Sequence, residues 1–523
     1  MGMFETMPGE SELRMVREMH GGLDLVIINP GAAHGIYGRL GAELTAVEPP
    51  LWARLIAGCV KDAKFTVRII DAEAERKDPV QVALDIFAWR PRLVCIAVYG
   101  HQPSASTQQM WAASAIAKAI RQISPVKILM VGGHVAALPA RTLKEETVDF
   151  VCRGEGPITV VELLRLDLRG QVEGLESVPD LVWWNAERGE SITNEPAPLI
   201  YDLTKLHGDV WQLLPMELYR AHNWQCFDNL TVRQPYASVY TSLGCSFRCH
   251  FCCINAPFHS NRYRMRNPID VTTEIINLYM DYKVRTFKIV DEMFVLNERH
   301  YVDICERLAA FNGSDDINIW AYARVDTIKP HTLQLMRRAG IKWLALGIES
   351  GSQYVRDGAD KTFTNSDIFT VVREIQKAGI NVIGNYIFGL PDDDMDSMRD
   401  TLNLALTLNT EFVNFYCAMA YPGSRLYDTA IKEGWNLPGS WKGYSQHNYE
   451  CMPLDTHEVL AADVLKFRDE AFQIYFRNHA YLDMIGEKFG AAAVKHVNEM
   501  VNYPLPRKIV EERFAPPDKV SAQ

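Results

Sequence analysis

Four cysteines stand close together in the middle of the chain, at Cys245, Cys249, Cys252 and Cys253. The first three form a C-x3-C-x2-C spacing directly after a predicted strand. Three thiolates on one short loop can wrap one face of a 4Fe–4S cluster, which normally takes four cysteines, so one iron would stay open to another ligand. We therefore expect Cys245, Cys249 and Cys252 to hold such a cluster and Cys253 to be a bystander.

A zinc site is the alternative interpretation of these thiols. A structural zinc site usually joins one C-x2-C pair to a second pair about 12 to 20 residues away, and no second pair follows Cys252. The chain has eleven cysteines, an odd number that is low for a disulfide scaffold of 523 residues. Several of the others lie singly in or beside apolar runs, where we interpret them as buried, small hydrophobic residues: Cys59, Cys95, Cys152, Cys305 and Cys417.

The cysteine loop opens a regular series of strands and helices. Candidate strands lie at 238–243, 286–290, 319–324, 343–348, 382–388 and 413–420, with helical stretches at 271–282, 299–311, 330–338, 366–377 and 396–408. These six β/α units are too few for a closed eight-stranded barrel and predict an open, partial (β/α)6 barrel. In such barrels the site lies at the carboxyl ends of the strands.

Polar residues and glycines stand at those predicted carboxyl ends. A glycine there lets a ligand approach the backbone closely. The polar side chains could bind the ligand directly. The alternatives are that Glu349 caps the next helix and that Arg324 is a buried ion-pair partner. In chain order the candidates are Asp291, Glu292, Arg324, Gly347, Glu349, Ser350 and Gly389.

The first third of the chain alternates short apolar strands with helices. Strands are expected at 25–29, 66–71, 93–99, 127–131 and 150–152, and helices at 50–62, 80–89, 107–123 and 159–166. Continuous apolar strands in this rhythm predict a doubly wound parallel sheet of the Rossmann-like type, which binds ligands beyond the carboxyl ends of its strands. The first βα turn lacks G-x-G-x-x-G, which argues against a nicotinamide cofactor.

Composition and charge exclude several classes of protein. The chain has 54 Lys and Arg against 65 Asp and Glu, a net charge of −11, so we expect no broad nucleic-acid-binding surface. No stretch approaches the roughly 18 consecutive apolar residues of a membrane span. The first twenty residues have no apolar core of a secretory signal, and a cytoplasmic location is expected.

We expect five regions along the chain. They are an N-terminal extension at 1–22, a Rossmann-like domain at 23–169, a connecting segment with little regular structure at 170–235, the partial barrel at 236–430, and a helical C-terminal region at 431–523.

The cysteine motif, with Phe251 as an aromatic residue before its last cysteine, resembles that of the radical SAM superfamily. The resemblance implies that S-adenosylmethionine (SAM) chelates the open iron and is cleaved to a 5′-deoxyadenosyl radical. It also implies SAM contacts at Phe251 and at the strand-end candidates from Asp291 to Gly389. Many members have a Gly-Gly-Glu-Pro-like stretch at the second strand, where this chain has Val290, Asp291, Glu292 and Met293.

Taken in order, pieces of the first third resemble the cobalamin-binding domain that is fused to radical SAM cores. These pieces are the Asn29-Pro30 turn, Pro49-Pro50, Asp71, Gly132-Gly133-His134 and Gly154-Glu155-Gly156. The resemblance covers about residues 22 to 430 and points to the subgroup of the anaerobic Mg-protoporphyrin ester cyclase and of the phosphinate and hopanoid methylases. It implies cobalamin contacts at Asn29, His34, Gly35, Gly38, Tyr99, His101, Ser104, Gly132, Gly133, His134, Gly154, Glu155 and Gly156.

The resemblance departs from one branch of cobalamin proteins. Those with a histidine on cobalt carry Asp-x-His-x-x-Gly, and no Asp stands two residues before His34. We therefore expect His34 to serve the loop by hydrogen bonding and the cobalt to have no protein nitrogen ligand.

Together these features resemble a cobalamin-dependent radical SAM methyltransferase. Such an enzyme passes a methyl group through methylcobalamin to an unactivated carbon or a phosphinate centre. The alternative is oxidation, cyclisation or rearrangement with the same cofactors and no methyl transfer. The expected partners are a small-molecule substrate and an external electron donor of flavodoxin or ferredoxin type. A non-catalytic sensor would give Glu349 and Arg324 no purpose.

Overall fold

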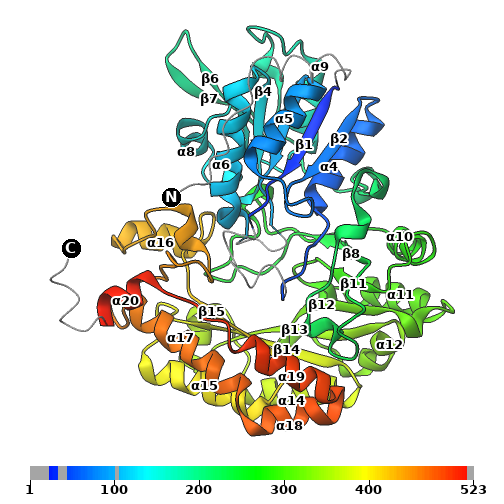
Figure 1. Cartoon of the computed structure of the whole chain (residues 1–523), viewed down its shortest axis with the longest axis vertical. Helices are drawn as coiled ribbons and strands as arrows, with labels where there is room; N and C mark the ends of the chain where they lie inside the picture. The colour runs from blue at the N-terminus through cyan, green and yellow to red at the C-terminus, as the bar shows by residue number, and fades with distance from the viewer. Residues whose placement is uncertain (1–22, 33–43, 101–104, 515–523) are drawn as a thin grey trace. The chain divides into compact units, whose positions relative to one another are not determined.

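The computed structural model describes residues 23–32, 44–100 and 105–514 (Figure 1). The chain forms two compact units. Unit 1 takes its residues from Met1–Ala33, Pro49–Leu218 and Cys253–Arg264, and unit 2 from His34–Glu48, Tyr219–Cys252 and Met265–Gln523. The chain therefore passes from one unit to the other five times. The five regions expected from the sequence stay a prediction about function, since the units are compact bodies and not functional domains.

Unit 1 is built on a seven-stranded sheet with the order β2-β1-β3-β4-β5-β6-β7. The first five strands are parallel and almost wholly buried, as continuous apolar runs require. They are β1 (Leu25–Asn29), β2 (Val67–Asp71), β3 (Leu93–Ala97), β4 (Lys127–Val131) and β5 (Phe150–Cys152). Because β1 lies between β2 and β3, the strand order reverses there, and the predicted doubly wound sheet is confirmed.

Two strands in the stretch at 170–235 were not foreseen. β6 (Leu181–Asn185) and β7 (Glu190–Thr193) form an antiparallel hairpin at the edge of the sheet. Its turn uses Gly189, at a φ of 68°, whose amide donates to the carbonyl of Asn185. Only Leu181 and Val182 are buried in β6, so the hairpin has too short an apolar run to stand out in the sequence.

The helices of unit 1 cover both faces of its sheet. α4 packs with α9 on one face and α5 with α6 on the other (Figure 1). α5 begins at a capping box in which Asp78 and Gln81 satisfy each other's backbone amides. The helices are α4 (Leu51–Asp62), α5 (Pro79–Trp89), α6 (Ala105–Ile123), α7 (Gly133–Ala137), α8 (Pro139–Glu145) and α9 (Pro157–Arg165).

Unit 2 is built on a six-stranded, all-parallel sheet with the order β15-β14-β13-β12-β11-β8, which confirms the partial (β/α)6 barrel. The strands are β8 (Tyr236–Val239), β11 (Thr286–Ile289), β12 (Asn318–Arg324), β13 (Ile341–Glu349), β14 (Asn381–Phe388) and β15 (Phe412–Cys417). Two two-residue strands, β9 (Ser242–Leu243) and β10 (Arg264–Met265), stand on either side of the cysteine loop.

The five predicted connecting helices of unit 2 are present with similar bounds, and two further helices, Gln353–Gly358 and Arg425–Glu433, were not predicted. They are α10 (Pro268–Asp281), α11 (Glu298–Ala309), α12 (Leu333–Arg338), α13 (Gln353–Gly358), α14 (Asn365–Lys377), α15 (Met395–Leu408) and α16 (Arg425–Glu433). The helix expected at 330–338 starts as a 3-10 turn, Pro330–Thr332, and becomes α-helical at Leu333.

The C-terminal region covers the edge of the barrel sheet. Gln446 bonds both the amide and the carbonyl of Cys417 at 2.9 Å, Arg468 donates to the carbonyl of Phe415, and Tyr475 to that of Thr410. These side chains replace a neighbouring strand for β15, which an open barrel leaves as an edge. The region holds α17 (Ala461–Phe476), α18 (His479–Phe489), α19 (Ala491–Met500) and α20 (Lys508–Phe514).

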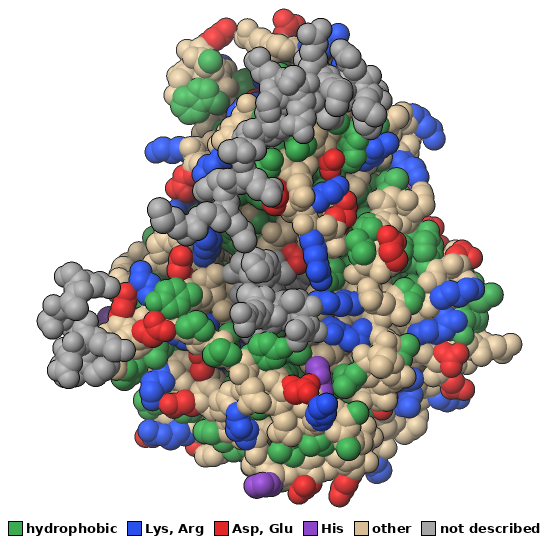
Figure 2. All heavy atoms as spheres, in the orientation of Figure 1, with side chains coloured by type: hydrophobic (Ala, Val, Ile, Leu, Met, Phe, Trp, Pro, Cys, Tyr) green, Lys and Arg blue, Asp and Glu red, His purple; other side chains and the backbone are tan. Residues whose placement is uncertain are grey.

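The surface carries both signs of charge. On the face drawn in Figure 2, Lys and Arg side chains are interspersed with Asp and Glu side chains. This mixture is typical of folded proteins. In the described part of the chain, no helix combines the length and the apolar character needed to cross a membrane.

Candidate active site

The barrel strands of unit 2 stack side chains in layers on their inner face. Register pairs place Lys288, Trp320 and Trp343 in one layer near the amino ends. Two residues further along, Tyr322 pairs with Ala345. Neighbouring strands in register point their side chains to the same face, so each layer is a row across the sheet. The row nearest the carboxyl ends holds Arg324, Gly347, Asn385 and Asn414.

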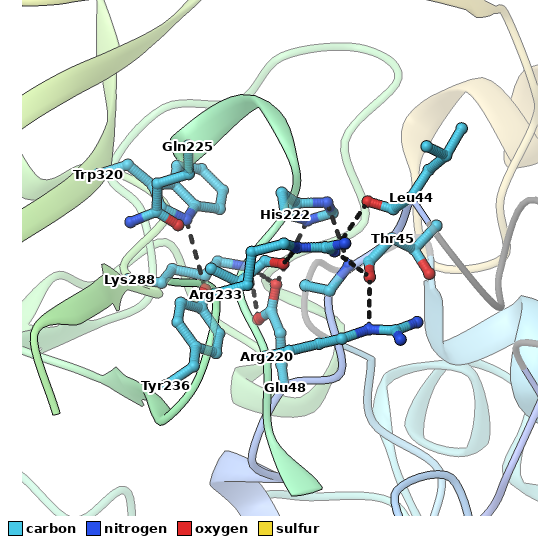
Figure 3. A network of polar contacts seen from close by, with 12 residues as sticks. Leu44, Thr45, Glu48, Arg220, His222, Gln225, Arg233, Tyr236, Lys288 and Trp320 are labelled. Carbon is cyan, nitrogen blue, oxygen red and sulfur yellow. Dashed lines mark hydrogen bonds and ion pairs between the residues drawn. The ribbon is translucent and has the colours of Figure 1, made fainter. Parts of the chain in front are cut away.

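A buried ionic network closes the inner face near the amino ends of the strands (Figure 3). The Lys288 ammonium lies 3.0 Å from the Glu48 carboxylate, and both side chains are almost fully buried. Glu48 also lies 3.7 Å from Nε2 of His222, whose ring stacks on Trp224. Burial holds the pKa of His222 below its usual range, although Glu48 opposes the shift. This layer is therefore a filled floor, with its charges paired.

Above this floor the inner face is less completely buried. Five inner-face residues of β12 to β15 are half-buried, whereas most of their neighbours in the same strands are buried. The Asn414 side chain donates to Asn385 at 2.9 Å, and Asn385 to the carbonyl of Leu346. The half-buried residues are Tyr322, Gly347, Asn385, Asn414 and Tyr416. Sequence reasoning named only Gly347. The other four residues could have been found because they occupy inner-facing positions, every second residue, in the predicted strands.

The cysteine loop follows β9 and meets this face at Arg324. The guanidinium of Arg324 lies 3.3 Å from the Cys249 sulfur and stacks over the Phe247 ring at 3.8 Å. A cation beside a sulfur favours the thiolate, the form that binds iron. Burial raises the pKa of Cys245 to about 11, and Glu292 and Cys249 add to the shift. Cys249 and Cys252 are half-buried, so both can be reached.

The donor set of this loop fits an iron–sulfur cluster. Three cysteines within eight residues provide three of the four ligands that a 4Fe–4S cluster takes. Among the described residues, however, no three His, Cys, Asp or Glu side chains are gathered around one point. The assignment of the cluster therefore rests on the donor set and on Arg324, and it stays a prediction.

Asp291 ties the second barrel strand to the strand that leads into the cysteine loop. It is 1% exposed and accepts hydrogen bonds from the Thr241 amide and hydroxyl and from the Ser242 hydroxyl. Burial raises its pKa, while these bonds oppose the shift. The side chain thus has a structural task. A contact of Asp291 or of half-buried Glu292 with SAM stays a prediction.

Glu349 sits at a strained backbone position at the end of β13. Its φ is 68°, and the strand register shifts between Gly347 and Glu349. A non-glycine residue at such a φ marks stored strain, which gathers at functional sites. The carboxylate is 2.8 Å from the ammonium of Lys361, which also lies 3.5 Å from the Gly347 carbonyl. Lys361 was not foreseen, because it lies twelve residues beyond Glu349, past a helix.

Two other predicted SAM contacts are engaged in packing. The Ser350 hydroxyl is fully buried and lies 3.1 Å from that of Thr401. Gly389 has a φ of 78°, and a Cβ there would lie 2.8 Å from the side chain of Val464. Its amide donates to Asp393. Their roles toward SAM, and that of half-buried Phe251, stay predictions.

In unit 1 the carboxyl edge of the sheet brings together several predicted cobalamin contacts. The Asn29 side chain donates to Asp71 across β1 and β2 at 2.8 Å. Gly132 has a φ of 155°, and a Cβ there would lie 2.1 Å from the Val98 carbonyl oxygen. His134 lies 3.1 Å from the Thr107 hydroxyl, and burial lowers its pKa to about 3. An edge of this kind, with glycine at a strand end, fits a bulky ligand such as a corrinoid.

The loop from Arg153 to Gly156 is held from two sides. The Tyr99 hydroxyl donates to the Glu155 carbonyl at 2.9 Å, while the Tyr99 ring stacks on Trp52. The Glu155 carboxylate forms a buried ion pair with Arg264 at 2.6 Å. Asp180 packs against Gly154, where a Cβ would lie 2.0 Å from its carboxylate. Five further predicted contacts lie outside the described residues: His34, Gly35, Gly38, His101 and Ser104.

Known sequence families match both the part of the chain with most of the predicted cobalamin contacts and the part with the cysteine loop. Residues 39–164 match the B12 binding domain, and residues 239–405 match the radical SAM superfamily. The chain therefore carries both domains of the cobalamin-dependent radical SAM enzymes. As in the resemblance drawn from the motifs, this family joins a B12-binding domain and a radical SAM domain in one chain.

Individual members of the family are distant. An uncharacterized methyltransferase of Pyrococcus horikoshii is 29% identical over 399 residues, 76% of this chain and 82% of that protein. The anaerobic magnesium-protoporphyrin IX monomethyl ester cyclase of Cereibacter sphaeroides is 25% identical over 75% of this chain, which spans 62% of the cyclase. Among solved structures, the radical SAM methyltransferase TsrM of Kitasatospora setae superimposes with a TM-score of 0.65 and 17% identity, over 88% of this chain and 90% of that one. The last comparison concerns the fold alone.

Proposed function

We propose that this radical SAM enzyme transfers a methyl group, by way of cobalamin, to an unactivated carbon or a phosphinate centre of a small molecule. The observation that carries the proposal is the presence of a B12-binding match and a radical SAM match in one chain. When bound, the cluster with SAM supplies a radical that removes hydrogen, and cobalamin supplies the methyl group. The relative from Pyrococcus horikoshii is named a methyltransferase, which supports methyl transfer rather than another reaction.

In this proposal the cysteine loop and Arg324 act together at the cluster. Cys245, Cys249 and Cys252 hold the iron. The guanidinium 3.3 Å from the Cys249 sulfur stabilises negative charge there. Arg324 is itself fixed by Asp326, whose two oxygens accept from it at 2.9 and 3.1 Å. The arginine is therefore a rigid neighbour of one ligand.

Glu349 is the residue we assign to the ribose hydroxyls of SAM. A carboxylate accepts two such hydrogen bonds at once. Lys361 holds one of its oxygens at 2.8 Å, and the positive φ aims the side chain away from the ordinary direction of the strand. Lys361 is then a positioning residue, because it acts through Glu349.

We place the reacting part of the substrate at the half-buried part of the inner face. This part carries two amides and two phenols from Asn385, Asn414, Tyr322 and Tyr416. The charged groups next to it, Arg324, Lys288 and Glu349, are each paired with a partner of opposite charge. Such side chains suit an uncharged group that forms hydrogen bonds. A reductant of flavodoxin or ferredoxin type and a cytoplasmic location complete the proposal.

The proposal can be tested in two stages with anaerobically reconstituted protein. First, SAM with a deuterated methyl group is added with reductant and hydroxocobalamin. S-adenosylhomocysteine and 5′-deoxyadenosine should both form, and the label should enter the bound corrinoid. Second, extracts of a deletion strain supply candidate substrates, and the true substrate should gain the label.

The cyclase relative makes oxidative ring closure the second candidate. It predicts 5′-deoxyadenosine in step with turnover and no label in the product. That result would retire methyl transfer. A Cys249→Ala variant is the matched control, because it should form no 5′-deoxyadenosine at all.

A further inference from the structure

The cysteine loop is directly followed by a segment that folds with the other unit. Residues Cys253–Arg264, here called the strap, start immediately after Cys252 and belong to unit 1. Cys252 and the two other predicted cluster ligands belong to unit 2. Any displacement of the strap is therefore passed to Cys252 through a single peptide bond.

The strap is fastened to unit 1 by apolar and polar contacts. Phe258 is 4% exposed and lies 6.0 Å from the Trp52 ring. The 3-10 turn Ala256–Phe258 packs against α7, the helix that follows the predicted cobalamin contacts Gly132 and Gly133. The ring nitrogen Nε2 of His259 lies 2.7 Å from the carbonyl oxygen of Arg153. The strap therefore rests on the elements expected to bind cobalamin.

The last residue of the strap carries the strongest of these contacts. Arg264 places two nitrogens 2.6 and 3.1 Å from the two oxygens of Glu155 and donates to the carbonyl of Ile200 at 2.9 Å. The side chains of the pair are only 2% and 8% exposed. Removing one partner of a buried pair leaves the other charge buried and uncompensated. The loop and the strap therefore move together or not at all.

The loop at the other end of this pair is the one predicted to contact cobalamin. Glu155 stands between Gly154 and Gly156, and Tyr99 holds its carbonyl at 2.9 Å. A cavity of about 70 Å³ lies beside the pair, lined by residues 155–159 and 257–259 among others. This space gives the loop and the strap room for a small shift.

We infer that Glu155 and Arg264 are positioning residues that couple occupancy of the cobalamin site to the stability of the cluster loop. The inference rests on the proposed function, because it needs both cofactors. A corrinoid that orders the loop from Arg153 to Gly156 also orders the strap, and with it the backbone at Cys252. Coupling between two sites is reciprocal, so a complete cluster should tighten corrinoid binding by the same factor.

The test measures loss of the cluster in the presence of an iron chelator. The reconstituted full chain is followed by its iron–sulfur absorbance with and without saturating hydroxocobalamin. In the wild type we expect hydroxocobalamin to slow cluster loss about fivefold or more, the range of ordinary coupling between sites. In Glu155→Gln and Arg264→Met the two rates should become equal, while each variant still takes up iron.

A buried ion pair outside the strap provides the matched control. Arg266 and Glu274 are 2.7 Å apart and each 6% exposed, and both belong to unit 2. Glu274→Gln should weaken the protein in general but keep the protection by hydroxocobalamin. If Arg264→Met does not fold, Arg264→Lys keeps the charge and loses the two-point contact, and it should show reduced protection.

Two results would overturn the inference. Equal protection in wild type and in Glu155→Gln would exclude the pair as the link, while leaving the proposed function intact. A wild type that binds no hydroxocobalamin at all would remove both the proposed function and the coupling. In the wild type, tighter binding of hydroxocobalamin to cluster-loaded than to cluster-free protein, by the same factor, would support the inference independently.

Discussion

Cys252 and Cys253 are neighbours in the chain, yet their thiols have different surroundings. Cys252 is half-buried, whereas Cys253 is 7% exposed and packs in unit 1. Burial raises the pKa of Cys253 to about 12, which keeps it a neutral thiol at physiological pH. Chemistry at this motif is therefore set residue by residue, through burial and through the cation at Arg324.

The first prediction compares the cysteines directly. Cys249→Ala should abolish the iron–sulfur absorbance at about 400 nm or leave a labile cluster, because one of three thiolate ligands is lost. Cys253→Ala should keep the absorbance and the iron content, since its thiol is buried and neutral. Absorbance and iron analysis after anaerobic reconstitution check both. Normal iron content and normal SAM cleavage in Cys249→Ala would refute the ligand assignment.

At the scale of elements, most of the fold could be predicted from the sequence. β1 and β4 have the predicted bounds, and the barrel strands differ from the predicted ones by at most four residues at either end. Long apolar or periodic runs explain this success. The helices α7, α8, α13 and α16 and the hairpin of β6 and β7 were missed, because each of these elements buries at most three residues, too few to show a period.

The candidate site was harder to predict from the sequence than the fold. The cysteines could be found because their ligand spacing is local. Lys361 and Asn414 could not, because their roles depend on partners at Glu349 and Asn385 that only the folded barrel brings near. Glu155 was expected to face cobalamin, but the structure shows its carboxylate paired with Arg264, a partner 109 residues away.

The turn after β14 gives a prediction that depends on pH. Asp393 is 0% exposed and accepts from the amides of Gly389 and Leu390. Burial raises its pKa from 3.8 to about 6, against the effect of these bonds. The folded state then holds the proton more tightly than the unfolded chain. The contribution of Asp393 to stability is therefore complete below about pH 4 and falls as the pH rises through about 6.

Asp393→Asn should remove this dependence. The free energy of unfolding of the wild type minus that of the variant should fall by on the order of 1 kcal/mol between about pH 5 and pH 7.5. Urea unfolding of the protein at the two values measures it. Asp396→Asn is the control. It removes a carboxylate that is 86% exposed at the start of α15, the helix that follows the turn of Asp393. A difference that is constant or rises with pH would contradict the raised pKa.

For the whole molecule, the main feature is that the two units share the chain in alternating pieces. The sequence predicts consecutive domains, because motifs and periodicity are read along the chain. The compact units instead exchange segments, with Cys253–Arg264 in unit 1 and His34–Glu48 in unit 2. Neither unit is therefore a single stretch of chain, and removal of one stretch takes contacts from both.

The last prediction concerns unit 1 on its own. A fragment of residues 23–218 lacks the strap, so Phe258 no longer covers Trp52 and Glu155 loses Arg264. A separate peptide that restores these contacts stabilises the folded fragment by mass action. With a synthetic peptide of residues 253–264 at about 100 times its dissociation constant, this is about 2.7 kcal/mol, and at about 2 to 4 °C per kcal/mol the melting temperature should rise by about 5 to 10 °C. The same peptide with Arg264→Met is the control and should give a much smaller rise. Equal effects of the two peptides would mean that Arg264 contributes nothing to fastening the strap.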